Sequence, residues 1–451
     1  MANDLFGAHG SSEPAVSRDS GSPGCTNAPR RTARRGLVRR AAIYGAPVVA
    51  LGTALWVVQE LRPLPALALV GDDAQSSFSF PGDAFSPPWP EHGQAAVTVA
   101  GSGTVGAFGE QKPVPTASVA KVMTAYIVLR DHPLKDRDDS GRQITVDAKA
   151  VQEGTAKDES RIEGLTVGQQ FSEQDMLRML MIPSGNNVAR LLARWDTASD
   201  SETAFVTKMN DTARELGLAN TTYTDPSGLD QGTVSTAVDQ LKLAEAVMKF
   251  DAFRQVVAMP NADIPGLPQR INNNNDRLLL SGSSVRGIKT GSNTAAGGTL
   301  SWAAYKTVAG KDRLILGTML DQHVQGADPY GSNSLVLVQD NSKKIIDAVR
   351  NALTSATVIR KGQVVGYIDD KLGGRTPVAA TEDLNAVGTP GQQLGVTLGD
   401  HGTPPPHGAK AGTTVGAVTV GSGPDAPTVP IALVKDLPAP SFTARLTRVR
   451  A

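Results

Sequence analysis

A serine and a lysine stand three positions apart in Ser118-Val119-Ala120-Lys121. On a helix this spacing places both side chains on one face, so the hydroxyl and the amine can touch. A serine hydroxyl is a poor nucleophile at neutral pH and needs a base to take its proton. Lysine acts as that base only where burial or a nearby cation lowers its pKa. The pair suggests nucleophilic catalysis, although such pairs also occur by chance on helix surfaces.

A second polar triplet, Ser184-Gly185-Asn186, lies between two stretches with helical patterns. Proline, serine, glycine and asparagine are turn residues, so a plain interhelical turn is the simpler interpretation. The functional interpretation is a loop that offers the Ser184 hydroxyl and the Asn186 carboxamide to a catalytic pocket.

The third triplet, Lys289-Thr290-Gly291, ends a predicted strand. A plain strand end is again the simpler interpretation. In the functional interpretation, Lys289 and the Thr290 hydroxyl hold a substrate carboxylate by charge-assisted hydrogen bonds. Gly291 then lets the substrate approach the backbone closely, because it has no side chain.

The order of the three triplets and their local settings match the set typical of β-lactamases and penicillin-binding proteins. The chain resembles the low-molecular-mass penicillin-binding proteins, which are serine-type D-alanyl-D-alanine carboxypeptidases. The resemblance covers about residues 93 to 353 and is carried by residues 115–124, 184–189, 224–230, 287–291 and 295–297. It implies an α/β (α+β) fold of the β-lactamase/transpeptidase-like kind. We therefore expect an antiparallel sheet flanked by helices, a helical subdomain and a small all-β C-terminal domain.

The resemblance also implies a role for each matched residue. Ser118 would attack the carbonyl of the penultimate D-alanine, and Lys121 would accept its proton. Ser184 would relay a proton towards the leaving D-alanine, and Asn186 would order Lys121 and the substrate amide. The expected substrate is the peptidoglycan stem peptide, with β-lactams as covalent inhibitors of Ser118 and no metal or cofactor.

Further implied roles concern charge. Lys289 and Thr290 would hold the terminal carboxylate, and Lys289 would help to keep Lys121 neutral. The backbone N–H groups of Ser118 and Ser292 would form an oxyanion hole, whose donors stabilise the charge that develops in the transition state.

Other activities remain open. A β-lactamase or a DD-endopeptidase is possible on the same fold, and a catalytically idle penicillin-sensing or wall-binding protein is the alternative of another class. Class A β-lactamases need a glutamate in Glu-x-x-Leu-Asn. The nearest string, Glu382-Asp383-Leu384-Asn385, lacks that spacing and lies in the β-rich region. No Gly-x-Ser-x-Gly elbow occurs, which argues against an α/β-hydrolase.

Several other features exclude function classes. Gly101 to Gly106 fits the dinucleotide fingerprint GxGxxG, but the glycines and prolines after it cannot open a helix, so a hairpin turn is expected. The formal net charge is zero and aromatic residues make up 4%, which disfavours nucleic-acid binding. The one cysteine is Cys25, and the six histidines show no HExxH spacing, which argues against a zinc protease.

We predict five segments. They are a disordered basic cytoplasmic tail (1–40), a transmembrane anchor (41–60), a Pro-rich extended stalk (61–92), the catalytic penicillin-binding domain (93–353) and the all-β domain (355–450). The apolar run of about 18 residues from Ala41 is near the lower limit for crossing a bilayer. Arginines crowd its N-terminal side, which predicts a cytoplasmic N-terminus and an extracytoplasmic catalytic domain. The alternative is secretion after signal cleavage near Ala66-Leu67-Ala68.

Hydrophobic periodicity places the elements. Strands are expected at 95–100, 104–108, 286–289, 299–308 and 313–319, and helices at 118–129, 171–181, 187–195, 236–250 and 341–353. In the last domain, strands are expected at 356–359, 364–368, 415–420 and 429–434.

Overall fold

The computed structural model describes residues 33–72, 76–136, 138–400, 405–423 and 425–447, with side chains from residue 47 onward. Residues 1–32 of the predicted tail, with Cys25, lie outside the described residues. The chain divides into two compact units, one of residues 1–64 with 441–451 and one of residues 65–440. Each unit is described by itself.

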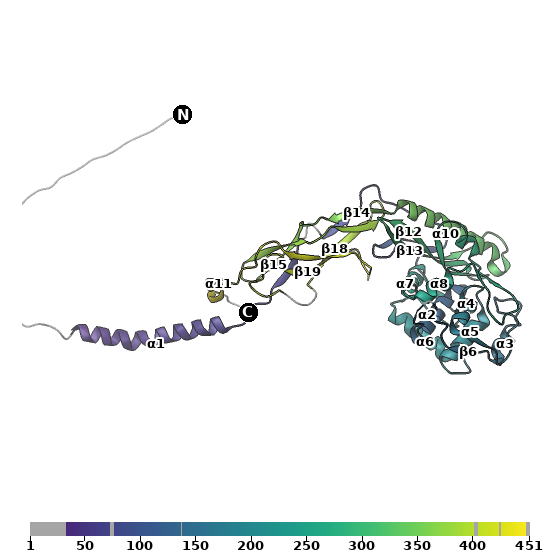
Figure 1. Ribbon diagram of the computed structural model, residues 1–451, viewed down its shortest axis with the longest axis horizontal. Coiled ribbons are helices and arrows are strands. Elements are labelled where there is room, and N and C mark those ends of the chain that lie inside the picture. The colour runs from purple at the N-terminus through teal and green to yellow at the C-terminus, as the bar shows by residue number, and fades with distance from the viewer. Residues whose placement is uncertain (1–32, 73–75, 137, 401–404, 424, 448–451) are drawn as a thin grey trace, which may run out of the picture. The chain divides into compact units, whose positions relative to one another are not determined.

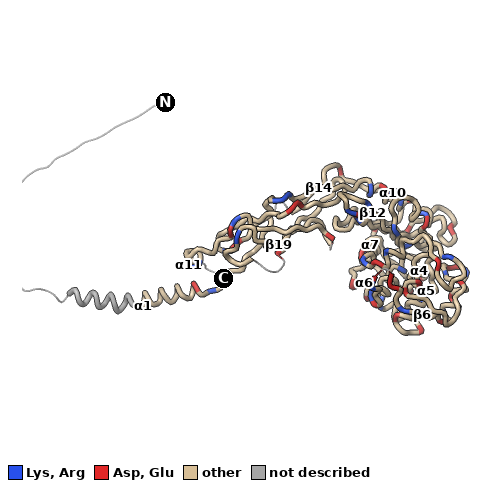
Figure 2. Tube along the Cα trace, viewed as in Figure 1, with Lys and Arg blue, Asp and Glu red and all other residues tan. Residues whose placement is uncertain are grey.

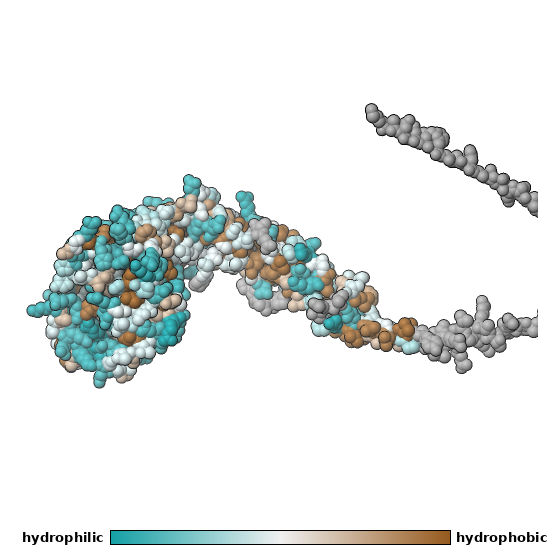
Figure 3. Space-filling view, turned by 180° about the vertical axis from the view of Figure 1, so that it is seen from behind, coloured by the Kyte–Doolittle hydropathy of each residue, from teal (hydrophilic) through white to brown (hydrophobic). Residues whose placement is uncertain are grey.

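The first unit contains helix α1 (Ala33–Leu61) and the short helix α11 (Phe442–Thr447) (Figure 1). Helix α1 starts before the predicted anchor at 41–60 and includes the last residues of the segment expected to be disordered. Hydrophobic side chains gather on its exposed described part (Figure 3). No helix in the described part of the chain is both long and apolar enough to cross a membrane.

The two helices of this unit contact each other through side chains. The rings of Trp56 and Phe442 lie 6.2 Å apart, and Arg445 pairs with Glu60 at 3.4 Å. The prediction of an all-β domain up to residue 450 is therefore wrong at its end, because residues 442–447 form a helix that belongs to the first unit.

The second unit is built on a five-stranded sheet in the order β11-β12-β13-β3-β4, in which every neighbouring pair is antiparallel. The strands are β3 (Gln94–Val99), β4 (Gly103–Phe108), β11 (Val285–Asn293), β12 (Gly297–Val308) and β13 (Lys311–Gln322). All five were expected near these bounds. Of the glycine motif predicted as a hairpin turn, Gly101 lies in the turn between β3 and β4, whereas Gly103 and Gly106 already lie in β4.

Alternate residues of this sheet enter two different cores, as the two-residue period of a strand requires. Val97 and Trp302 pack on the side of helix α10 (Ser332–Ala352), whereas Ala96 and Ala303 pack with the helices formed by residues between 121 and 257. The sheet therefore lies between two helical layers (Figure 1).

The larger helical layer begins with the 3₁₀ turn η2 (Ala117–Ala120) and α2 (Lys121–Asp131). It continues with α3 (Ala148–Glu153), α4 (Glu173–Met181), α5 (Asn186–Asp196), α6 (Thr203–Glu215), α7 (Ala237–Val247) and α8 (Asp251–Val257). The short helix α9 (Asp276–Leu279) instead packs on the side of α10, through Leu278. Three short strand pairs support the larger layer: β5 (Val114–Pro115) with β8 (Val234–Ser235), β6 (Gln143–Thr145) with β7 (Gln170–Ser172), and β9 (Asn261–Ala262) with β10 (Ile271–Asn272). Acidic and basic residues are interspersed along this part of the trace (Figure 2).

A β module follows helix α10. Its main sheet has the order β1-β15-β16-β20-β19-β18-β2, and β14 pairs with β17 beside it. The strands that follow α10 are β14 (Thr354–Ile359), β15 (Val364–Asp369), β16 (Arg375–Ala380), β17 (Leu384–Gly388), β18 (Gln393–Gly399), β19 (Thr414–Val420) and β20 (Thr428–Leu433).

The prediction of an extended stalk at 61–92 is wrong, because this segment supplies both edge strands of the module. Strand β1 (Ala68–Gly71) pairs with β15, and β2 (Ser77–Ser79) pairs with β18. Phe80, directly after β2, is buried in the core of the module. Prolines are tolerated around short edge strands, since one side of such a strand needs no backbone partner.

Candidate active site

Ser118 and Lys121 meet where η2 runs into α2. Lys121 Nζ lies 2.9 Å from Ser118 Oγ and donates a hydrogen bond of 2.7 Å to the carbonyl oxygen of Ser227. The side chain of Lys121 is fully buried, whereas Ser118 is partly exposed. The geometry therefore places an amine within proton-transfer distance of a hydroxyl that substrate can reach.

The environment of Lys121 favours its neutral form. Burial lowers the pKa of Lys121 well below its usual value, and the positive charge of Lys289 lowers it further. Arg190 acts in the same direction, while the carboxylates of Asp225 and Glu159 oppose the shift. A neutral amine beside a serine hydroxyl is the base that the nucleophile requires.

The loop at 225–229 holds Lys121 in place, a role that the sequence did not reveal because these residues also suit a plain turn. One oxygen of Asp225 accepts hydrogen bonds from the backbone N–H groups of Ser227 (3.0 Å) and Leu229 (3.1 Å). This fixes the carbonyl of Ser227 that binds Lys121. Gly228 has φ +76°, and a Cβ there would overlap the carbonyl oxygen of Ala117, so glycine allows the loop to lie against η2.

Ser184 and Asn186 lie in the connection between α4 and α5. Ser184 has φ +70°, is 2% exposed, and its Oγ is buried with no hydrogen-bond partner among the described residues. Asn186 begins α5, and its Nδ2 donates to Glu159 Oε2 at 2.6 Å. The amide thus binds Glu159 rather than Lys121, with which no hydrogen bond is recorded in the described residues.

Glu159 is a site residue that sequence reasoning missed, since it belongs to no motif. Its carboxylate accepts from Asn186 and from Arg190, whose Nη2 lies 2.9 Å away. The charge of Glu159 also acts on Lys121. Position 159 follows Lys157 and Asp158 in a charged run that reads as an ordinary solvated loop.

The asparagine run at 272–275, to which the sequence assigned no role, supports the Ser184 loop from outside the cleft. The backbone N–H of Asn274 donates to the carbonyl of Ile182 at 3.3 Å. Asn275 Nδ2 donates to the carbonyl of Gly287 in β11 at 3.4 Å. This segment therefore ties the loop before Ser184 to the strand that carries Lys289.

Strand β11 brings Lys289, Thr290 and Gly291 beside η2. Lys289 is 1% exposed, burial lowers its pKa to about 7, and its Nζ donates to the carbonyl of Thr290 at 2.9 Å. A Cβ at Gly291 would overlap Thr299 Oγ1 and lie 2.8 Å from Ser118 N. Glycine is thus needed for the strand to approach the backbone of Ser118, whereas the sequence had suggested room for substrate.

A cleft of about 460 Å³ opens between η2, the segment 157–160 and the end of β11, and Lys289, Thr290 and Gly291 do not line it. Three predicted site residues line it, namely Ser118, Asn186 and Ser292. Its other lining residues are Ala117, Lys157, Asp158, Glu159, Ser160, Gly228, Leu229, Asn293, Tyr330 and Ser332. Lys121 does not line the cleft but contacts Ser118, which does. The oxyanion hole at the N–H groups of Ser118 and Ser292 remains a prediction.

Comparisons with known proteins point to one family. Over 189 residues the chain is 32% identical to the D-alanyl-D-alanine endopeptidase of Pseudomonas aeruginosa, which covers 41% of this chain and 57% of that protein. Over 227 residues it is 32% identical to the D-alanyl-D-alanine carboxypeptidase DacC of Escherichia coli, covering 49% of this chain and 55% of that protein. The chain thus spans little more than half the length of these two relatives.

Two further comparisons extend this result. The D-alanyl-D-alanine carboxypeptidase of Streptomyces sp. strain K15 is 31% identical over 217 residues, which cover 46% of this chain and 72% of that protein. The solved structure of penicillin binding protein 5 from Haemophilus influenzae matches with a TM-score of 0.55 and 20% identity, over 78% of this chain and 99% of that one. At this identity the structural likeness is one of fold.

The family profile described as D-alanyl-D-alanine carboxypeptidase, peptidase S11, matches residues 93–323, just over half of the chain. The match includes Ser118, Lys121, Ser184 and Lys289. The chain therefore belongs to the D-alanyl-D-alanine carboxypeptidase family, peptidase S11.

Proposed function

We propose that the protein is a D-alanyl-D-alanine carboxypeptidase that removes the terminal D-alanine of peptidoglycan stem peptides through an acyl-enzyme on Ser118. One observation carries the proposal: Lys121 Nζ lies 2.9 Å from Ser118 Oγ, in surroundings that lower the pKa of the amine. The family profile and the names of the relatives agree with it.

Acylation begins when Ser118 Oγ attacks the carbonyl carbon of the penultimate D-alanine and Lys121 Nζ takes the hydroxyl proton. The C–O bond forms, and the carbonyl electrons move to the oxygen, which the N–H groups of Ser118 and Ser292 stabilise. The carbonyl then re-forms as the C–N bond breaks, and the proton held by Lys121 passes through Ser184 to the amine of the leaving D-alanine. Ser184 suits this step, because its Oγ has no other partner among the described residues.

Binding of the substrate carboxylate falls to Lys289 and Thr290. The protonated form of Lys289 supplies a charge-assisted hydrogen bond, and the Thr290 hydroxyl adds a second donor. Water then hydrolyses the ester: its oxygen bonds to the acyl carbon, one of its protons passes to Ser118 Oγ, and the shortened peptide leaves. A β-lactam acylates the same serine, and its ring-opened product stays attached to the enzyme and leaves slowly.

The test uses the purified full-length protein with a diacyl-D-Ala-D-Ala peptide and a labelled penicillin. We expect release of D-alanine and a single penicillin adduct on Ser118 by mass spectrometry, both lost in Ser118→Ala. Ser332→Ala is the matched control, because Ser332 is an exposed serine on the same cleft and should keep most of the activity. A penicillin adduct without release of D-alanine would instead indicate an idle penicillin sensor. Rapid turnover of penicillin would indicate a β-lactamase.

A second candidate activity is that of a DD-endopeptidase, because the Pseudomonas aeruginosa relative carries that name. The two activities separate when a cross-linked dimer of stem peptides is offered beside the linear pentapeptide. Cleavage of the linear peptide at a much higher kcat/KM supports the carboxypeptidase, and the reverse order supports the endopeptidase.

The proposed location is the cell membrane, with residues 41–60 as a single-pass anchor, the N-terminus in the cytoplasm and the catalytic domain outside. The apolar run and the arginines before it support this proposal. Protease added to intact cells should leave only the N-terminal tail protected. Recovery of the catalytic domain from the culture medium, with a new N-terminus near Ala68, would favour secretion after cleavage.

A further inference from the structure

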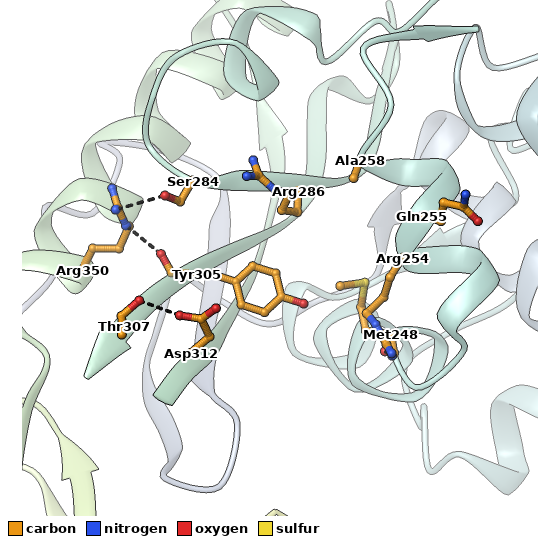
Figure 4. Close-up of a pocket in the computed structure, with 10 residues that line it drawn as sticks. All are labelled: Met248, Arg254, Gln255, Ala258, Ser284, Arg286, Tyr305, Thr307, Asp312 and Arg350. Carbon is orange, nitrogen blue, oxygen red and sulfur yellow. Dashed lines mark hydrogen bonds between the residues drawn. The ribbon is translucent and has the colours of Figure 1, made fainter. Parts of the chain in front are cut away.

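A second pocket, of about 510 Å³, lies at the beginning of β11 (Figure 4). Ser118 approaches the same strand further along, at Gly291. Residues from six elements or their ends line the second pocket: Met248, Arg254, Gln255, Ala258, Ser284, Arg286, Tyr305, Thr307, Asp312 and Arg350. None of these residues lines the catalytic cleft, and the volume is in the range of small-molecule sites.

Three arginines give the pocket its charge. Arg254 comes from α8, Arg286 from β11 and Arg350 from α10, so residues far apart in sequence converge on one place. Arg254 is paired with Asp251, and the carboxylate of Asp312 accepts a hydrogen bond from the Thr307 hydroxyl at 2.5 Å. The formal charges leave a positive excess.

Arg286 and Arg350 retain donors for a ligand. Arg286 is exposed, donates to the carbonyl of Val285 at 2.9 Å, and forms no ion pair with any acidic residue that the structure describes. Arg350 uses its Nε on the carbonyl of Tyr305 (3.0 Å) and one Nη on Ser284 Oγ (3.3 Å). A guanidinium has five N–H donors in a planar fork, which fits phosphate and carboxylate oxygens in pairs.

Tyr305 provides a flat surface and a hydroxyl in the middle of this pocket. Its ring lies between Arg286 and the end of α7 at Met248, with the hydroxyl directed towards Met248 and Arg254 (Figure 4). Burial raises the pKa of Tyr305, and the charges of Arg254 and Arg286 oppose this rise, so the phenol stays protonated at neutral pH. An aromatic face beside the hydroxyls of Ser284 and Thr307 suits a sugar ring with its own hydroxyls.

We propose that this pocket binds an acidic sugar, whose phosphate or carboxylate group is held by Arg286 and Arg350 while its ring lies against Tyr305. The site does not depend on Ser118 and so stands apart from the proposed peptidase activity.

Calorimetry on the full-length protein at low salt tests the proposal, with glucose 6-phosphate, glucuronate, glucose and inorganic phosphate as probes. We expect saturable binding of at least one acidic sugar that weakens with added salt, and no binding of glucose. The acidic sugar that binds with the higher affinity shows whether the pocket prefers phosphate or carboxylate.

Two variants and one control make the test specific. Arg286→Gln should weaken binding by at least about tenfold, because it removes a charge-assisted pair of hydrogen bonds. Ala258→Glu should have a similar effect, since it places a carboxylate beside Arg286 (Figure 4). Arg214→Gln, a change of an exposed arginine on α6, should leave binding unchanged. Penicillin acylation of Ser118 should persist in all three and shows that each is folded.

The proposal is wrong if neither acidic sugar binds saturably, or if Arg286→Gln and Ala258→Glu, still acylated by penicillin, bind as the wild type does. Equal affinity for inorganic phosphate and glucose 6-phosphate would show that the pocket does not recognise the sugar ring. Equal affinity for glucose and glucose 6-phosphate would show that the arginines do not contribute to binding.

Discussion

Strand β11 carries a basic side chain in the catalytic region and another in the arginine-lined pocket, and the two side chains are buried to different extents. Lys289, in the catalytic region, is 1% exposed, and burial lowers its pKa to about 7. Arg286, three positions earlier, is exposed, and a guanidinium stays charged at any physiological pH. Burial thus adjusts the protonation of an amine for chemistry, while exposure keeps a permanent charge for binding.

The catalytic region goes further, because it buries two amines close enough to influence each other. The charge of Lys289 lowers the pKa of Lys121, whose burial alone already disfavours protonation. No such coupling is needed in the pocket lined by Arg254, Arg286 and Arg350, where the guanidinium groups have only to present hydrogen-bond donors. The contrast predicts that the same chemical change has very different effects in the two regions.

The largest difference is expected from removing one basic group in each region. Lys121→Met keeps the length of the side chain and removes the base, so acylation by penicillin should slow by about 10²–10⁴-fold. Arg286→Met should leave the acylation rate unchanged. Stopped-flow measurement of acylation compares the two variants, and a similar loss in both would show that the arginine-lined pocket and the catalytic region do not function separately.

An intermediate effect is expected where β11 contacts η2. Gly291→Ala forces the strand away from Thr299 and from the backbone of Ser118, which should reduce the acylation rate by about 10²-fold. Gly395→Ala in β18 is the control, because a Cβ there meets no atom within 4 Å. An unchanged rate in Gly291→Ala would mean that the close approach is not required for catalysis.

The smallest effect concerns a buried charge outside both pockets. Glu173 is 1% exposed, its Oε1 has no partner among the described residues, and burial raises its pKa from 4.5 to about 7. Between these two values the folded protein holds a proton that the unfolded chain has lost, so stability falls as pH rises through this window. Above it, Glu173→Gln should stabilise the protein by about 1–2 kcal/mol, a figure reduced for solvent screening.

Urea unfolding followed by tryptophan fluorescence checks this prediction. The gain from Glu173→Gln should be present at pH 8 and absent at pH 4, where the carboxyl is protonated in both states. Glu110→Gln, at an exposed position paired with Lys112, should change little at either pH. A gain of equal size at pH 4 would point to packing instead of charge.

Much of the fold could be predicted, because strands such as β12 and helices such as α5 show hydrophobic periodicity and even the weak alternation of β3 indicates a strand. The edge strands β1 and β2 could not, since strands of four and three residues between prolines show too little alternation to be detected. Helices α6 and α8 were also missed. For the site, the triplets indicated the serine–lysine pair and two of the cleft-lining residues, Ser118 and Asn186.

The sequence did not reveal the residues that hold these groups in place. Glu159 accepts hydrogen bonds from Asn186 and Arg190, and the carbonyl of Ser227 accepts one from Lys121. These bonds join segments far apart in sequence, and no local pattern marks such contacts. Gly291 was recognised, but the reason for it is the backbone of Ser118, which only the folded arrangement brings near.

The pairing of β1 with β15 and of β2 with β18 makes the catalytic domain an insertion within the β module. The two edge strands are made first, and their partners emerge from the ribosome only after the whole catalytic domain. The peptidase part can therefore fold while the module is still open, and the last strands close the sheet by joining segments that are more than 290 residues apart in sequence.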